Sequence, residues 1–163
     1  MTTSSKVSEH RKPNRSHGKY RENVAALIVN ARGRILLLKR AKTTHHWQLP
    51  QGGVDDGESR RHAMTREVRE ETGLTHLKQL AVVPDFYTYE WPKVAKYAHA
   101  QYIGQRQSLY VYRHLGRDTD VRIDHHEADA HQWVHPRDFV SSVARVRHKM
   151  AEKAIAIYND ILR

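Results

Sequence analysis

Two short apolar runs, Val24–Val29 and Ile35–Leu38, open the patterned part of the chain. The polar segment between them, Asn30-Ala-Arg-Gly33, ends in glycine, and this arrangement predicts two β-strands joined as a hairpin. Thr88–Pro92 and Gly104 carry turn-forming residues and are expected in loops. Further strands are predicted near Leu77–Val83, Phe86–Tyr89, Ser108–Arg113 and Gln132–Val134. The pattern therefore predicts a sheet built from several short strands.

Two helices are predicted beside these strands. Residues 59–72 are charged helix formers without glycine or proline, and Gly73 stands where a helix commonly ends. A second helix, amphipathic and C-terminal, is predicted because apolar residues recur at spacings of three and four after Pro136. Those residues are Phe139, Val143, Val146, Met150, Ala154, Ile157 and Ile161. Strands interrupted by helices predict an α/β class of fold, either mixed α+β or an α/β/α sandwich.

Charge is concentrated at the beginning of the chain. The 163 residues contain 28 Lys and Arg against 18 Asp and Glu, a formal net charge of +10. Residues 1–21 hold six of the basic residues, one acidic residue and few large aliphatic ones. We expect residues 1–19 to form a disordered basic arm and residues 20–163 to form the folded domain. The positive charge suits a nucleotide or nucleic-acid partner, but solubility alone would also account for it.

The composition also limits the chemistry and the cellular location. The chain has no cysteine, which excludes disulfides, thiolate nucleophiles and Cys-type metal sites, and which fits a reducing compartment. No apolar run approaches the ~18 residues of a membrane-spanning helix. The first 20 residues lack the apolar stretch of a secretory signal peptide. We therefore expect a cytoplasmic protein without a membrane partner. The sequence leaves the oligomeric state open, and a monomer is compatible with it.

Three glutamates of the first predicted helix form the most informative pattern in the sequence. Glu67, Glu70 and Glu71 stand at positions i, i+3 and i+4, which share one face of a helix. Their mutual repulsion can be relieved by solvation, by neighbouring arginines such as Arg66, or by a bound cation. Carboxylate oxygens suit Mg²⁺ or Mn²⁺, and the glycine-rich loop before the helix suits a phosphate group. The spacing thus makes this segment a candidate site for a metal–phosphate complex.

The same segment resembles the Nudix box, the signature of the Nudix hydrolase family. Every specified position of that motif is matched, by Gly52, Glu58, Arg66, Glu67, Val68, Glu70, Glu71, Gly73 and Leu74. The resemblance implies an α/β/α sandwich with a mixed sheet, and hydrolysis of a nucleoside diphosphate linked to another group. It implies that Glu67, Glu70, Glu71 and the Gly52 carbonyl bind two or three Mg²⁺ or Mn²⁺ ions. Arg66 would orient the glutamates, and Glu58 would have a supporting role.

Segments outside the box resemble dinucleoside polyphosphate hydrolases and bacterial RNA pyrophosphohydrolases. They are Tyr20-Arg21-x-Asn23-Val24, Trp47-Gln-Leu-Pro-Gln-Gly-Gly53, Tyr89-Glu-Trp-Pro92, Gly104-Gln-Arg-Gln107 and Glu127, which precedes Trp133-Val134. This resemblance spans about residues 20–150. It implies that Glu127 completes the metal site and that Tyr89 stacks on a base. The expected substrate-binding residues are Arg21, Lys39, Arg40, Gln51, Gly53, Tyr89, Gln105, Gln107, Arg145 and Arg147.

The implied reaction is attack of a metal-activated water on phosphorus, with Glu70 or Glu127 as the general base. Expected substrates are dinucleoside polyphosphates such as diadenosine tetraphosphate, 5′-triphosphorylated RNA ends, or both. Departures from the RNA-processing branch, such as Arg40-Ala41 in place of two arginines, leave RNA specificity open. Two alternatives also remain: hydrolysis of another nucleotide (a nucleoside triphosphate, a nucleotide sugar or ADP-ribose), and a non-catalytic RNA-binding module.

Overall fold

A computed structural model describes residues 19–92 and 102–162. The basic arm expected over residues 1–19 therefore lies outside the described residues, except for Lys19, the first residue of the first strand. Within the described residues, seven strands form one sheet. Their bounds are β1 Lys19–Val29, β2 Ile35–Arg40, β3 Trp47–Gln48, β4 Gln51–Gly53, β5 Leu77–Glu90, β6 Tyr102–His114 and β7 Ala128–Val134. The hairpin predicted from the first two apolar runs is confirmed, since Val29 of β1 pairs with Ile35 of β2.

The sheet is mixed and divides around β1. Strands β1 and β6 are parallel, while β5 pairs with β6, and β7 with β2, in antiparallel fashion. The N-terminal half of β1 pairs instead with β4, through Asn23, Val24 and Ala25. Strand β1 therefore has β2 as its neighbour at its C-terminal end and β4 further toward its N-terminus. The loop of residues 54–59 connects β4 to the first helix.

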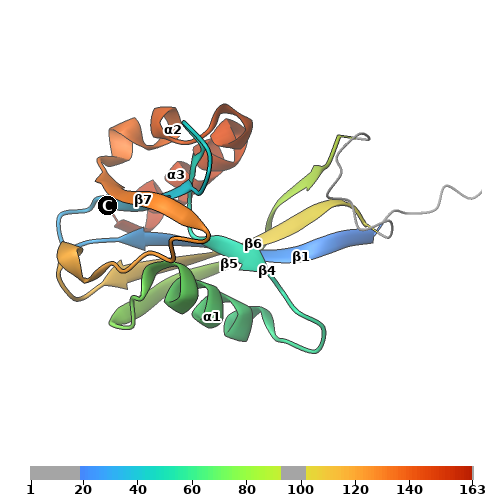
Figure 1. Ribbon diagram of the computed structural model, residues 1–163, viewed down its shortest axis with the longest axis horizontal. Helices are drawn as coiled ribbons and strands as arrows, with labels where there is room; N and C mark the ends of the chain where they lie inside the picture. The colour runs from blue at the N-terminus through green and yellow to red at the C-terminus, as the bar shows by residue number, and fades with distance from the viewer. Residues whose placement is uncertain (1–18, 93–101, 163) are drawn as a thin grey trace, which may run out of the picture.

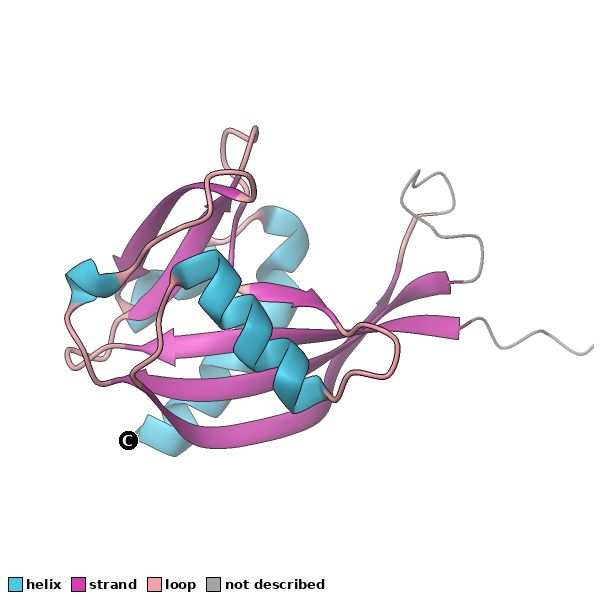
Figure 2. Cartoon of the chain, turned by 60° about the horizontal axis from the view of Figure 1, so that its bottom comes forward, coloured by secondary structure: helices cyan, strands magenta, loops and turns pink. Residues whose placement is uncertain are grey.

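Helices cover both faces of this sheet. Helix α1, Arg60–Thr72, lies on one face, and α2, Phe139–Ser142, and α3, His148–Leu162, lie on the opposite face (Figures 1 and 2). Three short 3₁₀ turns are η1, Asp118–Asp120, η2, Pro136–Asp138, and η3, Arg145–Arg147. None of the helices formed by the described residues has the length and apolar character needed to cross a membrane. The predicted α/β/α sandwich is thus the observed architecture.

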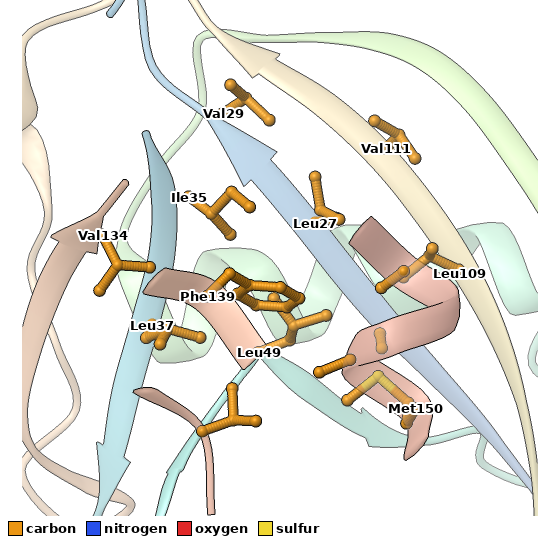
Figure 3. Close-up of a cluster of buried hydrophobic side chains, with 14 of the residues drawn as sticks. Leu27, Val29, Ile35, Leu37, Leu49, Leu109, Val111, Val134, Phe139 and Met150 are labelled. Carbon is orange, nitrogen blue, oxygen red and sulfur yellow. The ribbon is translucent and has the colours of Figure 1, made fainter. Parts of the chain in front are cut away.

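The apolar runs of β1 and β2 are continuous because both faces of the sheet are buried. Leu27 and Val29 point to the α2/α3 side, where they join Phe139 and Met150 in the larger core cluster (Figure 3). The alternate residue Ile28 points to the α1 side, into a second cluster with Met64 and Val68, among others. The period of two along a strand therefore divides one apolar run between two cores.

The predicted C-terminal helix is not one continuous helix. It is broken between α2 and α3, where Val143 and Ala144 are extended and the Ala144 N–H donates to the Trp47 carbonyl of β3, at 2.9 Å. The Ser141 and Ser142 hydroxyls both donate to the Asp138 carbonyl, an interaction that competes with regular helix. As a result Val146, expected on the apolar face, is 78% exposed.

Two other local expectations are also corrected. The strands predicted as Leu77–Val83 and Phe86–Tyr89 form one strand, β5, with a register irregularity between Val83 and Tyr87, where Asp85 has a φ of 49°. Gly104, expected in a loop, lies in β6. Its lack of a Cβ is required there, because a Cβ would overlap the backbone oxygen of Tyr89. The predicted loop Thr88–Pro92 likewise begins inside β5.

Candidate active site

The carboxylate face of α1 is packed against strand β4. Ser59 caps the N-terminus of α1 by accepting from the His62 N–H, and Gly73 ends it in the left-handed conformation. Gly52 lies directly against Glu67, because a Cβ on this glycine would overlap the Glu67 carboxylate. The backbone N–H of Gln51 donates to Glu71 Oε2 at 2.8 Å. Strand β4 thus positions two of the three glutamates on this face of α1.

Arg66 connects the acidic groups around this helix. Its Nε and Nη2 donate to the two oxygens of Glu58 at 3.0 and 2.9 Å, and Nη2 also donates to the Gly53 carbonyl at 3.0 Å. Its Nη1 donates to Glu67 at 2.6 Å and more weakly to Glu70 at 3.4 Å. The hydrogen bonds from Arg66 lower the pKa of Glu58 to about 2. Arg66 therefore contacts Glu58, Glu67 and Glu70 together, and the predicted orienting role of Arg66 and supporting role of Glu58 stay predictions.

Two carboxyl groups of α1, those of Glu67 and Glu71, lie in surroundings that disfavour their charged form. Burial, together with the nearby charges of Glu67 and Glu127, raises the pKa of Glu71 to about 9, although the hydrogen bond from the Gln51 N–H opposes the shift. Burial also raises the pKa of Glu67, although Arg66 opposes the shift. Glu127 comes from the turn before β7, whose position is fixed by an Ala41 N–H bond to the Glu127 carbonyl at 2.8 Å. Tertiary structure thus brings Glu127 beside the glutamates of α1, as predicted.

This set of side chains fits a divalent cation. Buried carboxylates that repel one another are stabilised by a hard cation, and Gly52 leaves the Glu67 carboxylate free of side-chain obstruction. Within residues 19–92 and 102–162, no three acidic or histidine side chains are already arranged as a metal cage. Arg66 pairs with oxygens of Glu67 and Glu70 in this arrangement.

A cleft of about 1100 Å³ adjoins this face at β4. Three arginines, Arg21, Arg40 and Arg147, make it electropositive, and the aromatic residues Tyr87 and Tyr89 lie on its β5 side. The remaining lining residues are Asn23, His46, Gln48, Gln51, Gly52, Gly53, Glu90, Trp91, Pro92, Gln105, Val146 and Met150. Guanidinium groups bind phosphates and aromatic rings stack on bases, so the cleft suits a nucleotide.

The structure separates the ten predicted substrate-binding residues into two groups. Seven line the cleft: Arg21, Arg40, Gln51, Gly53, Tyr89, Gln105 and Arg147. Lys39, Gln107 and Arg145 are not among the lining residues. Lys39 Nζ lies 3.9 Å from Asp129, and Gln107 is fully buried beneath the cleft. Arg145 is exposed in η3.

Sequence reasoning missed several lining residues. Tyr87 was detectable, because it stands two residues before Tyr89 on the same strand and so shares its face. Gln48 belongs to the Trp47–Gly53 segment, and nothing in its sequence position distinguishes a lining role. The spacing of Val146 and Met150 predicts the apolar face of a single helix, and only the break before α3 shows that they reach the cleft.

Comparison with known proteins identifies the family of this chain. Residues 19–158 match the family model described as NUDIX domain. A protein of Cereibacter sphaeroides named RNA pyrophosphohydrolase is 34% identical over 150 residues, which are 88% of this chain and 93% of that protein. Another of that name, from Novosphingobium aromaticivorans, is 32% identical over 152 residues, covering 88% of this chain and 94% of that protein.

Solved structures share the fold. An Ap4A hydrolase binary complex from C. elegans covers 86% of this chain and 98% of its own, with a TM-score of 0.65 and 23% identity. A MutT protein from Methanosarcina mazei Go1 covers 88% of this chain and 97% of its own, with a TM-score of 0.60 and 24% identity. The fold and the carboxylate helix define a hydrolase that acts on pyrophosphate bonds. The chain belongs to the Nudix family.

Proposed function

We propose that this protein is a Mg²⁺-dependent pyrophosphohydrolase that acts on 5′-triphosphorylated RNA ends, with dinucleoside polyphosphates as a second substrate. The observation that carries the proposal is that strand β4 lines the arginine-rich cleft and also contacts the clustered glutamates of α1. The names of the relatives at 30–39% identity favour the RNA substrate. The proposal includes a cytoplasmic location, which fits a sequence without cysteine.

Each group in the site has a chemical role in this proposal. Glu67, Glu70, Glu71 and Glu127, with the Gly52 carbonyl, would hold two or three Mg²⁺ ions, with Mn²⁺ as a substitute. Bound there, the ions would supply charge neutralisation and a water of lowered pKa. Arg66 keeps Glu67 and Glu70 oriented, while Arg21, Arg40 and Arg147 bind the polyphosphate.

Glu70 is the proposed acceptor of the proton from the attacking water. Its side chain is 57% exposed, and its contact to Arg66 is the long one, at 3.4 Å. A carboxylate held this loosely can turn toward a water molecule, whereas Glu71 is buried and bound to the Gln51 N–H. Glu127, which is also exposed, is the rival candidate for this role.

The test is a Mg²⁺-dependent assay on two substrates in parallel. One is a short RNA with a 5′-triphosphate, followed by release of phosphate or pyrophosphate, and the other is diadenosine tetraphosphate, followed by chromatography. We expect turnover of both with preference for the RNA. Glu70→Gln should reduce kcat by about 10²–10⁴-fold, the usual contribution of a general base, without changing the fold. A matched Glu127→Gln variant decides between the two candidate bases.

Other results would change the assignment. A marked preference for diadenosine tetraphosphate would make the dinucleotide the main substrate. Activity on neither would direct the search to nucleoside triphosphates, nucleotide sugars and ADP-ribose. Salt-sensitive RNA binding without any Mg²⁺-dependent turnover would indicate a binding module instead of an enzyme. A near-wild-type kcat for both glutamine variants would contradict the proposed roles of the carboxylates.

The dinucleotide is retained as a second substrate because of the aromatic side of the cleft. The rings of Tyr87 and Tyr89 lie 5.8 Å apart, centroid to centroid, and both line the cleft. Stacking on a base is tolerant of base identity. We therefore expect Tyr89→Ala to raise KM for both substrates, and an unchanged KM would remove Tyr89 from the substrate site.

A further inference from the structure

Arg147 is held in the cleft by neutral oxygens. Its Nη1 lies 3.4 Å from Gln51 Oε1, and its Nη2 lies 3.4 Å from Gln48 Oε1. In the part of the chain that the structure describes, Arg147 forms no ion pair, whereas Arg60 and Arg66 each pair with carboxylates. A guanidinium has donors only, so amide oxygens orient it while its positive charge stays uncompensated.

A buried amide fixes the orientation of Gln51. Gln107 is fully buried, and its Nε2 donates to Gln51 Oε1 at 2.8 Å and to Asn23 Oδ1 at 2.6 Å. Because Gln107 Nε2 donates to it, Gln51 must present its oxygen, rather than its NH₂ group, at this junction. The same oxygen then faces Arg147. The buried amide therefore determines which atom of Gln51 faces the guanidinium.

We propose that Gln51, fixed by Gln107, is a positioning residue that keeps Arg147 oriented and uncompensated for the phosphates of the substrate. The proposal rests on the proposed function. It changes the expected role of two residues: the Gln51 and Gln107 side chains act through Arg147, and not through contact with substrate. A carboxylate in place of the Gln51 amide would form a charge-assisted contact with Arg147 and compete with the phosphates.

The first variant is Gln51→Glu, which keeps the shape of the side chain and leaves the Gln51 N–H bond to Glu71 in place. We expect KM for the 5′-triphosphorylated RNA to rise about 10-fold, the equivalent of about 1.4 kcal/mol of binding, with kcat changed much less. Gln51→Met is the second variant, because it removes the acceptor without adding charge. It should also raise KM, since Arg147 loses its orientation.

A double-mutant cycle with Arg147→Met separates positioning from simple repulsion of the substrate. If Gln51 acts through Arg147, both Gln51 variants should lose most of their effect on KM in the Arg147→Met background. Equal effects in the two backgrounds would overturn the proposal, because a new charge that only repels phosphate acts whether or not Arg147 is present. Unfolding midpoints of all variants serve as the control for folding.

Binding of inorganic tripolyphosphate, measured by calorimetry without Mg²⁺, provides a readout that does not depend on catalysis. The same non-additive pattern is expected in the dissociation constants. If no substrate is hydrolysed but this pattern is present, the proposed function fails and the positioning role stands. Additive effects, or an absence of tripolyphosphate binding by the wild-type protein, would overturn the positioning role.

Discussion

Arg66 shows how much of the site depends on single residues. One guanidinium donates to Glu58, Glu67, Glu70 and the Gly53 carbonyl. These contacts join the loop before α1, strand β4 and two of the carboxylates. Because Arg cannot be deprotonated in a protein, the guanidinium keeps its positive charge over the whole working range of pH. Among its carboxylate partners, Glu58 has a pKa lowered to about 2 and therefore keeps its charge down to strongly acidic pH.

Glu58→Gln tests this ion pair through pH. The pKa of Glu58 is lowered from 4.5 to about 2, chiefly by hydrogen bonds from Arg66. A lowered carboxyl pKa means that the stabilisation is fully present above about pH 4.5 and is lost as the pH falls through about 2. Urea unfolding should therefore show the wild type more stable than the variant at neutral pH, with the difference shrinking near pH 2.5. An equal difference at both pH values would contradict the prediction.

At the scale of elements, α3 supports the strand that carries the cleft aromatics. The Lys153 Nζ donates to the Phe86 carbonyl at 2.9 Å and lies 5.6 and 5.8 Å from the ring centroids of Phe86 and Tyr87. This contact falls within the irregular part of β5, between Val83 and Tyr87, where regular pairing with β6 is interrupted. The hydrogen bond from Lys153 thus stabilises a part of β5 in which regular hydrogen bonding to β6 is missing.

Lys153→Met should reduce the free energy of unfolding by about 1 kcal/mol, through loss of a hydrogen bond and cation–π contacts. The matched control is Lys149→Met, one turn earlier on the same helix, where the lysine is also exposed. A surface change of that kind is expected to stay within about 0.5 kcal/mol. Urea denaturation of the three proteins checks the difference, and equal losses for both variants would refute a specific role for Lys153.

At the scale of the whole molecule, the site joins distant parts of the chain around the divided sheet. Helix α1, packed against strand β4, supplies one set of carboxylates, and the turn before β7 supplies Glu127. The cost of this assembly is electrostatic, because buried carboxylates of like charge are brought together. A bound cation should therefore contribute to the stability of the entire fold, and not only to catalysis.

The pH dependence of Mg²⁺ stabilisation tests this coupling. With a folded-state pKa of about 9 against 4.5 unfolded, Glu71 binds its proton in the folded protein where the unfolded chain has lost it. The stability of the ion-free protein should thus fall as the pH rises between those values. Saturating Mg²⁺ should raise Tm more at about pH 8.5 than at about pH 6, because binding releases the proton. The gain should be reversed by EDTA and reduced in Glu71→Gln. A gain that is independent of pH would contradict this account.

Much of the protein followed from local rules that operate within a few residues. Two short apolar runs on either side of a turn that ends in glycine predicted a hairpin, and α1 ends at Gly73 as expected. The spacing of Glu67, Glu70 and Glu71 placed them together, because residues three and four apart share a helix face. The Nudix box could be identified for the same reason, since its functional groups lie close in sequence.

Only the tertiary structure decided what depends on contacts between distant segments. The hydrogen bond from Ala144 to Trp47 breaks the C-terminal helix, and this break places Val146 and Arg147 at the cleft. Sheet register places Gln105 between Arg21 and Tyr89, but buries Gln107 below them. Periodicity describes the faces of one element, whereas the choice of partner for each face is made by packing and pairing across the whole chain.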